Sequence, residues 1–273
     1  MRDALVDITS ILKTINPWMA NVSLSYLQQS LMIQKSVFFL VIILQFMGHS
    51  KYLSFKNGLM TSKSLVRSYS RSYLKMMPEG PEVRSLVDSI SSRFEGDSWQ
   101  LSNAAIISGR YIKAAPENWD TMLSKLPAKV NHIKCKGKFI YFQCGDFYIF
   151  NTLGLSGGWS LSPSKTYTRA SFTLSKGADI QKFLQFYDMI GYGTLKICLT
   201  KAELDQKLNK IGMCWLEEKP SFEDFLVRVK KTKPNRPLVV FLMDQTKLAG
   251  IGNYILSEGM VFTARRIFCS FLD

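Results

Sequence analysis

The sequence predicts an α+β fold in which one helix precedes a set of antiparallel strands and several helices follow them. Apolar residues at helical spacing begin just after residue 78, and short runs rich in β-branched and aromatic residues follow. After Leu199 the spacing becomes helical again. Strands followed by helices imply two subdomains.

The first helix is expected from about Pro81 to Phe94. Pro81 suits a first helical position, because its fixed φ is helical and its missing N–H has no partner there. The apolar residues that follow it form one stripe of an amphipathic helix. They are Val83, Leu86, Val87, Ile90 and Phe94.

The strands that follow are separated by turns containing glycine, such as Lys136-Gly137 and Cys144-Gly145-Asp146, which favour antiparallel pairing. One helical insert is expected at Asn118–Leu126. The predicted strands are Ala104–Ile112, Lys129–Lys134, Phe139–Gln143, Phe147–Asn151, Ala170–Leu174, Phe183–Tyr187 and Thr194–Leu199.

The last quarter of the chain is predicted to be helical, with Pro220-Ser221 and Lys233-Pro234 as start and stop signals. The expected helices are Ala202–Ile211, Phe222–Lys231, Pro237–Met243 and Ile251–Phe262.

Composition narrows the class of protein. The 273 residues are 47% hydrophobic, which excludes wholesale disorder, and 35 Lys and Arg against 21 Asp and Glu give a net charge of +14. That excess favours a nucleic acid or an anionic membrane surface as partner. Five cysteines without a CxxC pair argue against a disulfide framework and a Cys-rich zinc finger, and two histidines exclude a three-histidine metal site.

Residues 1–76 form a different kind of sequence, because no acidic residue occurs between Asp7 and Glu79. The Ser-rich, basic stretch Ser50–Lys75 resembles an organellar transit peptide, and the alternative is upstream sequence outside the working protein. A membrane anchor is a third reading, although the apolar run Val37–Met47 is shorter than the about 20 residues of a spanning helix. We expect no membrane partner.

The sharpest local motif is Met77-Pro78-Glu79-Gly80-Pro81-Glu82-Val83, at the start of the first helix. It resembles the amino terminus of the formamidopyrimidine-DNA glycosylase and endonuclease VIII family, whose mature chains begin Pro-Glu. Three further matches follow in the order of that family. They are Lys136-Gly137-Lys138, Leu153-Gly154-Leu155-Ser156-Gly157, and Asp244-Gln245 with Ala249-Gly250-Ile251-Gly252-Asn253-Tyr254 through Glu258.

The chemistry of these residues can be stated without the family. A free N-terminal proline is a secondary amine that can attack C1′ of a deoxyribose and form an iminium, whereas an internal proline nitrogen is an amide. A neighbouring carboxylate can protonate the ring oxygen, and an ammonium can contact phosphate and assist proton transfer.

The resemblance implies a role for each of these residues. Pro78 would be the nucleophile, Glu79 the general acid and Lys138 the lysine of β-elimination, with Glu82 in the same pocket. Asn253 would hold a backbone phosphate, which Gly250 and Gly252 allow the backbone to approach. Taken singly, these residues also suit plain structural roles, as helix-start residues, first-turn acids and an exposed turn lysine.

The resemblance also implies an architecture: a helix and two-sheet antiparallel β-sandwich over residues 77–200, then a helical subdomain over 201–273 with a partial helix–two-turn–helix motif. The implied function is base-excision repair of oxidised bases in double-stranded DNA, by a monomer without metal or small-molecule cofactor, in the nucleus or a mitochondrion. A catalytically inactive DNA-binding remnant is the rival, and a membrane-associated basic protein is a third possibility.

The chain departs from the family pattern at several positions. Leu155 replaces the usual Met among three side chains that fill the space of the extruded base, Tyr192 can be the aromatic wedge or only a sheet residue, and Ile190 replaces an Arg. Thr152 stands in place of a His that contacts phosphate. The chain also has no residues for the family's C-terminal finger and its Arg, so we expect strand cleavage to stop at β-elimination.

Overall fold

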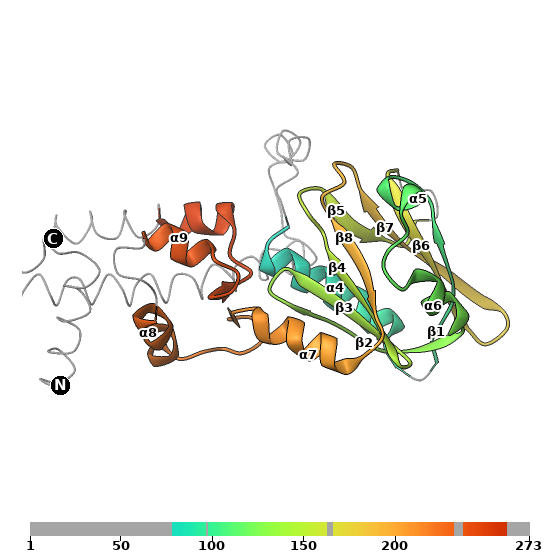
Figure 1. Cartoon of the computed structure of the whole chain (residues 1–273), viewed down its shortest axis with the longest axis horizontal. Coiled ribbons are helices and arrows are strands. Elements are labelled where there is room, and N and C mark those ends of the chain that lie inside the picture. The colour runs from blue at the N-terminus through green and yellow to red at the C-terminus, as the bar shows by residue number, and fades with distance from the viewer. Residues whose placement is uncertain (1–77, 97, 163–165, 232–236, 261–273) are drawn as a thin grey trace, which may run out of the picture. The chain divides into compact units, whose positions relative to one another are not determined.

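The computed structural model describes residues 78–96, 98–162, 166–231 and 237–260, which fall into a first unit ending at Lys210 and a second beginning at Ile211. The expected extension over residues 1–76 lies outside the described residues. The first unit contains α4 (Gly80–Phe94), β1 (Gln100–Ile106), α5 (Arg110–Lys113), α6 (Trp119–Ser124), β2 (Ala128–Lys136), β3 (Phe139–Cys144), β4 (Phe147–Thr152), β5 (Gly157–Ser160), β6 (Thr168–Lys176), β7 (Ile180–Asp188), β8 (Thr194–Cys198) and α7 (Lys201–Lys210) (Figure 1).

The strands follow the hydrogen-bonded order β5-β7-β6-β1-β2-β3-β4-β8, and every neighbouring pair is antiparallel. The link between β1 and β2 is narrow, because only Gln100 with Lys129 and Leu101 with Ala128 are paired there. The expected two sheets are therefore two four-stranded halves of one continuous order, joined at this link.

The two halves pack face to face around one apolar core. Side chains from both, such as Leu101 and Phe186 from one and Ile133 and Ile149 from the other, belong to the same buried cluster. Trp159 on β5 lies at its centre, with ring centroids 5.0 Å from Phe142 and 5.4 Å from Phe186. This packing confirms the α+β fold with antiparallel strands.

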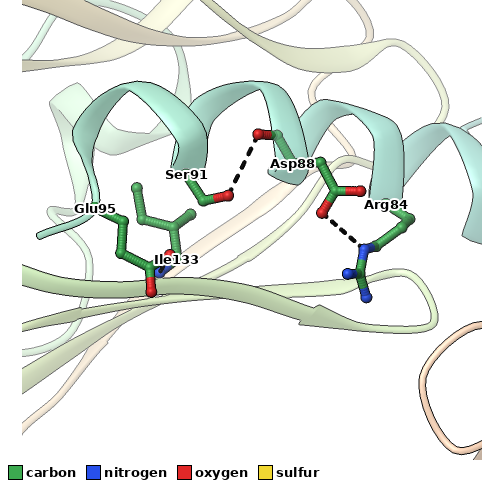
Figure 2. Close-up of polar contacts among 5 residues, drawn as sticks. All are labelled: Arg84, Asp88, Ser91, Glu95 and Ile133. Atoms are coloured by element: carbon green, nitrogen blue, oxygen red, sulfur yellow. Dashed lines mark hydrogen bonds and ion pairs between the residues drawn. The ribbon is translucent and has the colours of Figure 1, made fainter. Parts of the chain in front are cut away.

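Helix α4 packs against β2 and buries the stripe that the sequence predicts, including Val83, Val87 and Phe94. Figure 2 shows its polar face, where Nε of Arg84 lies 2.8 Å from Oδ1 of Asp88. At its C-terminal end, Oε2 of Glu95 accepts a 3.5 Å hydrogen bond from the backbone N–H of Ile133 on β2. The helix is thus fixed to the sheet along its apolar face and at its C-cap residue.

One predicted strand needs correction, and one observed strand was not predicted. The predicted strand Ala104–Ile112 is wrong after Ile106, because the chain bends at Ser108-Gly109 and continues as α5. Strand β5 has no counterpart among the predicted strands, since Gly157-Gly158 lack the side chains typical of strands. It forms by pairing with β7.

The second unit contains β9 (Met213–Cys214), α8 (Phe222–Lys230), α9 (Leu238–Met243) and β10 (Leu248–Ala249), and residues 253–260 are helical. The parallel pair of β9 and β10 is a further element that the sequence analysis did not predict. Residues of the predicted last helix beyond 260 lie outside the described residues. The first unit ends at Lys210, since α7 packs on its strands β4 and β8, and the expected domain boundary at 200/201 stays a prediction.

Candidate active site

The start of α4 brings three of the predicted site residues together. Glu79 is the N-cap residue and is 1% exposed, while Pro78 beside it is half-buried. The backbone N–H of Glu79 donates a 3.2 Å hydrogen bond to Oε2 of Glu82, one turn into the helix. The cap therefore fixes the backbone at Pro78 and Glu79 and turns the Glu82 carboxylate back toward them.

Lys138 lies in the two-residue turn between β2 and β3, where Lys136 pairs with Phe139. Gly137 has a φ of 58°, the positive value that a type II′ hairpin turn requires at its first central position. The Gly-Lys pair thus closes a tight turn and places the lysine at a fixed point on the sheet.

Partial burial lowers the pKa of Lys138, and the negative charges of Glu79 and Glu82 oppose that shift by raising it. These opposing effects place the ammonium within electrostatic reach of both carboxylates. Of the residues chosen from the sequence, Pro78, Glu79 and Glu82 thus lie at the start of α4, and the charges of the two glutamates act on Lys138 in the β2–β3 turn.

Leu155 and Tyr192 lie on two adjacent loops. Gly154 has a φ of 65°, and a Cβ atom there would stand 2.6 Å from the backbone nitrogen of Gly193. Tyr192 is 66% exposed, so its reading as a sheet residue is wrong, whereas Leu155 is half-buried and Ile190 is exposed. The backbones of the loops that carry Leu155 and Tyr192 thus approach each other closely.

Strand register relates these loops to Lys138. Phe139 pairs with Thr152, and Thr152 pairs with Thr194. Lys138 lies just before β3, Leu155 lies after the end of β4, and Tyr192 lies before the start of β8. The lysine and both loops therefore lie at one end of the β3-β4-β8 half.

Ser156 and Asp188 are buried between the two loops and had no assigned role in the sequence analysis. The hydroxyl of Ser156 donates a 2.6 Å hydrogen bond to Oδ1 of Asp188, and Gly193 N–H donates one of 2.6 Å to Oδ2. Ser156 also accepts from the backbone N–H of Ile190 at 2.9 Å. Because Ser156 and Asp188 are distant in sequence, no local pattern predicts this pair.

Asn253, Gly250 and Gly252 cluster within the second unit. Oε1 of Gln245 accepts from Gly250 N–H at 2.9 Å, and its Nε2 donates to the carbonyl of Ile251 at 2.7 Å. The two glycines are buried, and Asn253 is exposed as the first residue of the 253–260 helix. The loop is thus fixed around Gln245 and leaves the Asn253 side chain on the surface.

Other classes of site receive no support from the described residues. Among them, no group of three or more His, Cys, Asp and Glu side chains is placed to hold a metal ion, and no helix is long and apolar enough to cross a membrane. Cys135 and Cys144 are buried free thiols, and burial raises the pKa of Cys144 to about 12.

Comparison with known proteins identifies the first unit. The family model described as "Formamidopyrimidine-DNA glycosylase N-terminal domain" matches residues 77–195. A formamidopyrimidine-DNA glycosylase of Bacillus cereus is 25% identical over 188 residues, which cover 67% of this chain and 65% of the relative. One of Lactococcus lactis subsp. cremoris is 26% identical over 197 residues, with coverages of 67% and 65%. The chain thus spans just under two thirds of the length of these relatives.

Solved structures agree on the fold. The MutM (Fpg) protein of Thermus thermophilus has a TM-score of 0.52 at 25% identity, covering 64% of this chain and 60% of that one. The Lactococcus lactis Fpg bound to DNA with an abasic site has a TM-score of 0.52 at 23% identity, covering 64% of each. The Pro-Glu motif, the sandwich and the order of motifs agree with these matches, and residues 77–195 of the chain match the N-terminal domain of the formamidopyrimidine-DNA glycosylases.

Proposed function

We propose that this chain is a base-excision DNA glycosylase with abasic-site lyase activity, which removes oxidised bases through an iminium at Pro78. The observation that carries the proposal is the buried Glu79 beside Pro78 at the start of α4, together with the charges of Glu79 and Glu82 that act on Lys138. An amine, a buried carboxylate and a lysine of lowered pKa are the groups that this chemistry needs.

In the proposed reaction the lone pair of the Pro78 nitrogen attacks C1′ of the damaged nucleotide. The bond from C1′ to the base breaks, and the base leaves with that electron pair and takes up a proton. Glu79 protonates the ring oxygen as the bond from C1′ to that oxygen opens, which leaves an iminium between C1′ and Pro78. The burial of Glu79 suits a proton donor shielded from bulk water.

Lys138 acts in the elimination that follows. Removal of a proton from C2′ shifts its electron pair toward the iminium and expels the 3′ phosphate. The lowered pKa of Lys138 increases the fraction of neutral amine available to assist near neutral pH. The remaining ammonium fraction can contact the departing phosphate.

We propose damaged double-stranded DNA as the substrate. Solved relatives support this choice, since one is described as Fpg bound to DNA containing an abasic site and another as MutM in complex with DNA containing carbocyclic 8-oxo-G. Leu155 and Tyr192 would fill the space of the extruded nucleotide, and Asn253 with the backbone around Gly250 and Gly252 would hold a phosphate.

We further propose a monomer that uses neither metal nor small-molecule cofactor, in the nucleus or a mitochondrion. The basic, acid-free segment over residues 8–78 supports the second compartment. Sedimentation of the purified protein and imaging of the tagged full chain test these two points.

Borohydride trapping on a duplex with one abasic site tests the function. A chain whose first residue is Pro78 should form a covalent adduct, whereas the 273-residue chain with an intact Met1 should not, because Pro78 is then an amide. Pro78→Gly in the shorter chain should reduce the adduct at least about tenfold, and the exposed-acid control Asp120→Asn should not.

Two outcomes contradict the proposal. Trapping of the full chain with Met1 in place would assign the nucleophile to another amine. Binding of the abasic duplex without any adduct from the Pro78 chain would identify an inactive DNA-binding remnant of the family.

A further inference from the structure

An arginine from a neighbouring strand holds the loop that carries Tyr192. Arg169 lies on β6, and its Nε donates a 2.8 Å hydrogen bond to the carbonyl of Asp188, where the loop leaves β7. One of its terminal nitrogens donates to the carbonyl of Met189 at 3.3 Å, and the other to the hydroxyl of Ser108 at 3.3 Å. All three guanidinium nitrogens thus contact the protein.

The place of Arg169 is itself fixed. Its carbonyl accepts from the backbone N–H of Ile107 at 2.9 Å, beside the bend that ends β1. A Cβ atom on Gly109 would stand 2.6 Å from the Arg169 guanidinium, so the bend leaves just enough room for this side chain. The guanidinium is therefore held between the bend and the loop.

The far end of the loop is fixed by other groups. The Asp188 carboxylate accepts from Gly193 N–H, and Arg110 donates to the carbonyl of Gly193 at 2.5 Å. Burial would raise the pKa of Asp188, but hydrogen bonds from Ser156, Gly193 and Gly191 and the charge of Arg169 together hold it below its ordinary value. The carboxylate is thus a charged acceptor beneath the loop.

Little side-chain packing supports the loop on the side of these hydrogen bonds. A cavity of about 230 Å³ borders the loop, and its lining includes Arg110, Arg169, Ile190 and Gly191. On this side the loop rests on polar contacts with two arginines, while Ile190 and Tyr192 are exposed.

We propose that Arg169 is the positioning residue of the loop over residues 188–193, where it gives the exposed Tyr192 a rigid base from which to enter a DNA duplex. Arg169 does not take over base pairing from the Arg that Ile190 replaces, because its nitrogens are directed at the loop carbonyls and Ser108. The inference rests on the proposed function, since a wedge is useful to a protein that opens duplexes.

Two measurements on the full 273-residue chain test the inference without requiring catalysis. Amide hydrogen exchange at Ile190 and Gly193 reports on the loop itself. The fluorescence of 2-aminopurine placed opposite a tetrahydrofuran site in a duplex reports on wedge insertion. The variants are Arg169→Met and Arg169→Lys, with Arg93→Met as the matched control on the exposed face of α4.

In Arg169→Met, exchange at the two loop amides should be at least about tenfold faster, and the 2-aminopurine signal should fall to about a third of that of the unaltered chain. Arg169→Lys should give intermediate values, because an ammonium donates to the carbonyls without the planar fork. Arg93→Met should change neither. Unaltered exchange at amides of β3 shows that the variant is folded.

Unchanged loop exchange and fluorescence in folded Arg169→Met would overturn the inference while leaving the proposed function intact. If that variant does not fold, Ser156→Ala removes the neighbouring acceptor of the Ile190 N–H and is judged by the same two signals. An unaltered chain that gives no fluorescence change on the duplex would contradict the proposed function, and the wedge role with it.

Discussion

The indole N–H of Trp159 on β5 donates a 3.0 Å hydrogen bond to Oδ1 of Asn151 on β4, inside the sandwich core. The two strands belong to opposite halves of the strand order, and among the described strands backbone pairing joins these halves only at β1 and β2. Nδ2 of Asn151 donates to the carbonyl of Thr194 on β8 at 2.8 Å. One buried amide therefore links both halves near the β8 end of the loop that carries Tyr192.

Replacement of Asn151 by Ala should lower the free energy of unfolding by about 1–3 kcal/mol, because the Trp159 N–H and the Thr194 carbonyl lose their partner in a buried site. Urea unfolding followed by Trp fluorescence measures it. The exposed Asn209→Ala on α7 should change stability by no more than about 0.5 kcal/mol. Equal losses of unfolding free energy in the two variants would show that the buried hydrogen bonds of Asn151 do not stabilise the fold.

Lys138→Met should make the protein more stable at neutral pH while removing assistance to strand cleavage. The pKa of Lys138 is lowered in the folded state, so the unfolded chain binds more protons between that lowered pKa and the ordinary value of 10.5. The unaltered protein therefore gains stability as pH rises through this window, and the advantage of Lys138→Met shrinks there. Urea midpoints at pH 7 and pH 10 measure both trends, and a gap that widens with pH would contradict them.

Gly154→Ala should separate the two loops that carry Leu155 and Tyr192. An alanine at a φ of 65° is strained, and its Cβ would also meet Gly193 N at 2.6 Å and Tyr192 C at 2.8 Å. Gly177→Ala is a matched control, since Gly177 has a φ of 64° with nothing within 4 Å of the added Cβ.

Both alanines should lose about 1–2 kcal/mol of stability to backbone strain. Gly154→Ala should lose more than Gly177→Ala and should also bind an abasic duplex more weakly. Similar stability and similar DNA affinity in the two variants would mean that the contact between the loops has no role.

DNA affinity should fall steeply with salt, because 26 basic against 19 acidic residues in 78–273 leave a charge of +7 for phosphate contacts. Asn253→Ala should weaken binding by a factor of about 10 or more at each salt concentration, the value of one hydrogen bond to a charged acceptor, and equally for different sequences. Ser257→Ala, on the same helix, is the control. Fluorescence anisotropy between about 50 and 200 mM salt measures the DNA affinity, and an affinity that does not change with salt would argue against phosphate contacts.

The sequence predicted most of the fold because the relevant signals are local. The stripe from Val83 to Phe94 and the Gly-Lys turn before Phe139 each lie within one element, and the structure realises both. The order of motifs was sufficient to select Pro78, Glu79 and Lys138, and in the structure the charge of Glu79 acts on Lys138.

What sequence could not predict depends on contacts between distant segments. Strand β5 exists because β7 pairs with it, although Gly157-Gly158 carry no strand signal. The exposure of Tyr192 and the role of Arg169 depend on how a loop rests against the end of β1. A residue type alone cannot reveal such support, since an arginine in a strand is ordinary.

The turn between β2 and β3 does not tolerate a change in length. One inserted residue would shift the pairing of Lys136 with Phe139 and turn Phe139 away from Phe150, whose ring centroid lies 5.0 Å from its own. The packing of Phe139 therefore constrains the length of this turn more strictly than it constrains which residue occupies position 138. Chemistry at this position can be redesigned by substitution, but its distance from the start of α4 is set by hydrophobic packing on the strand behind it.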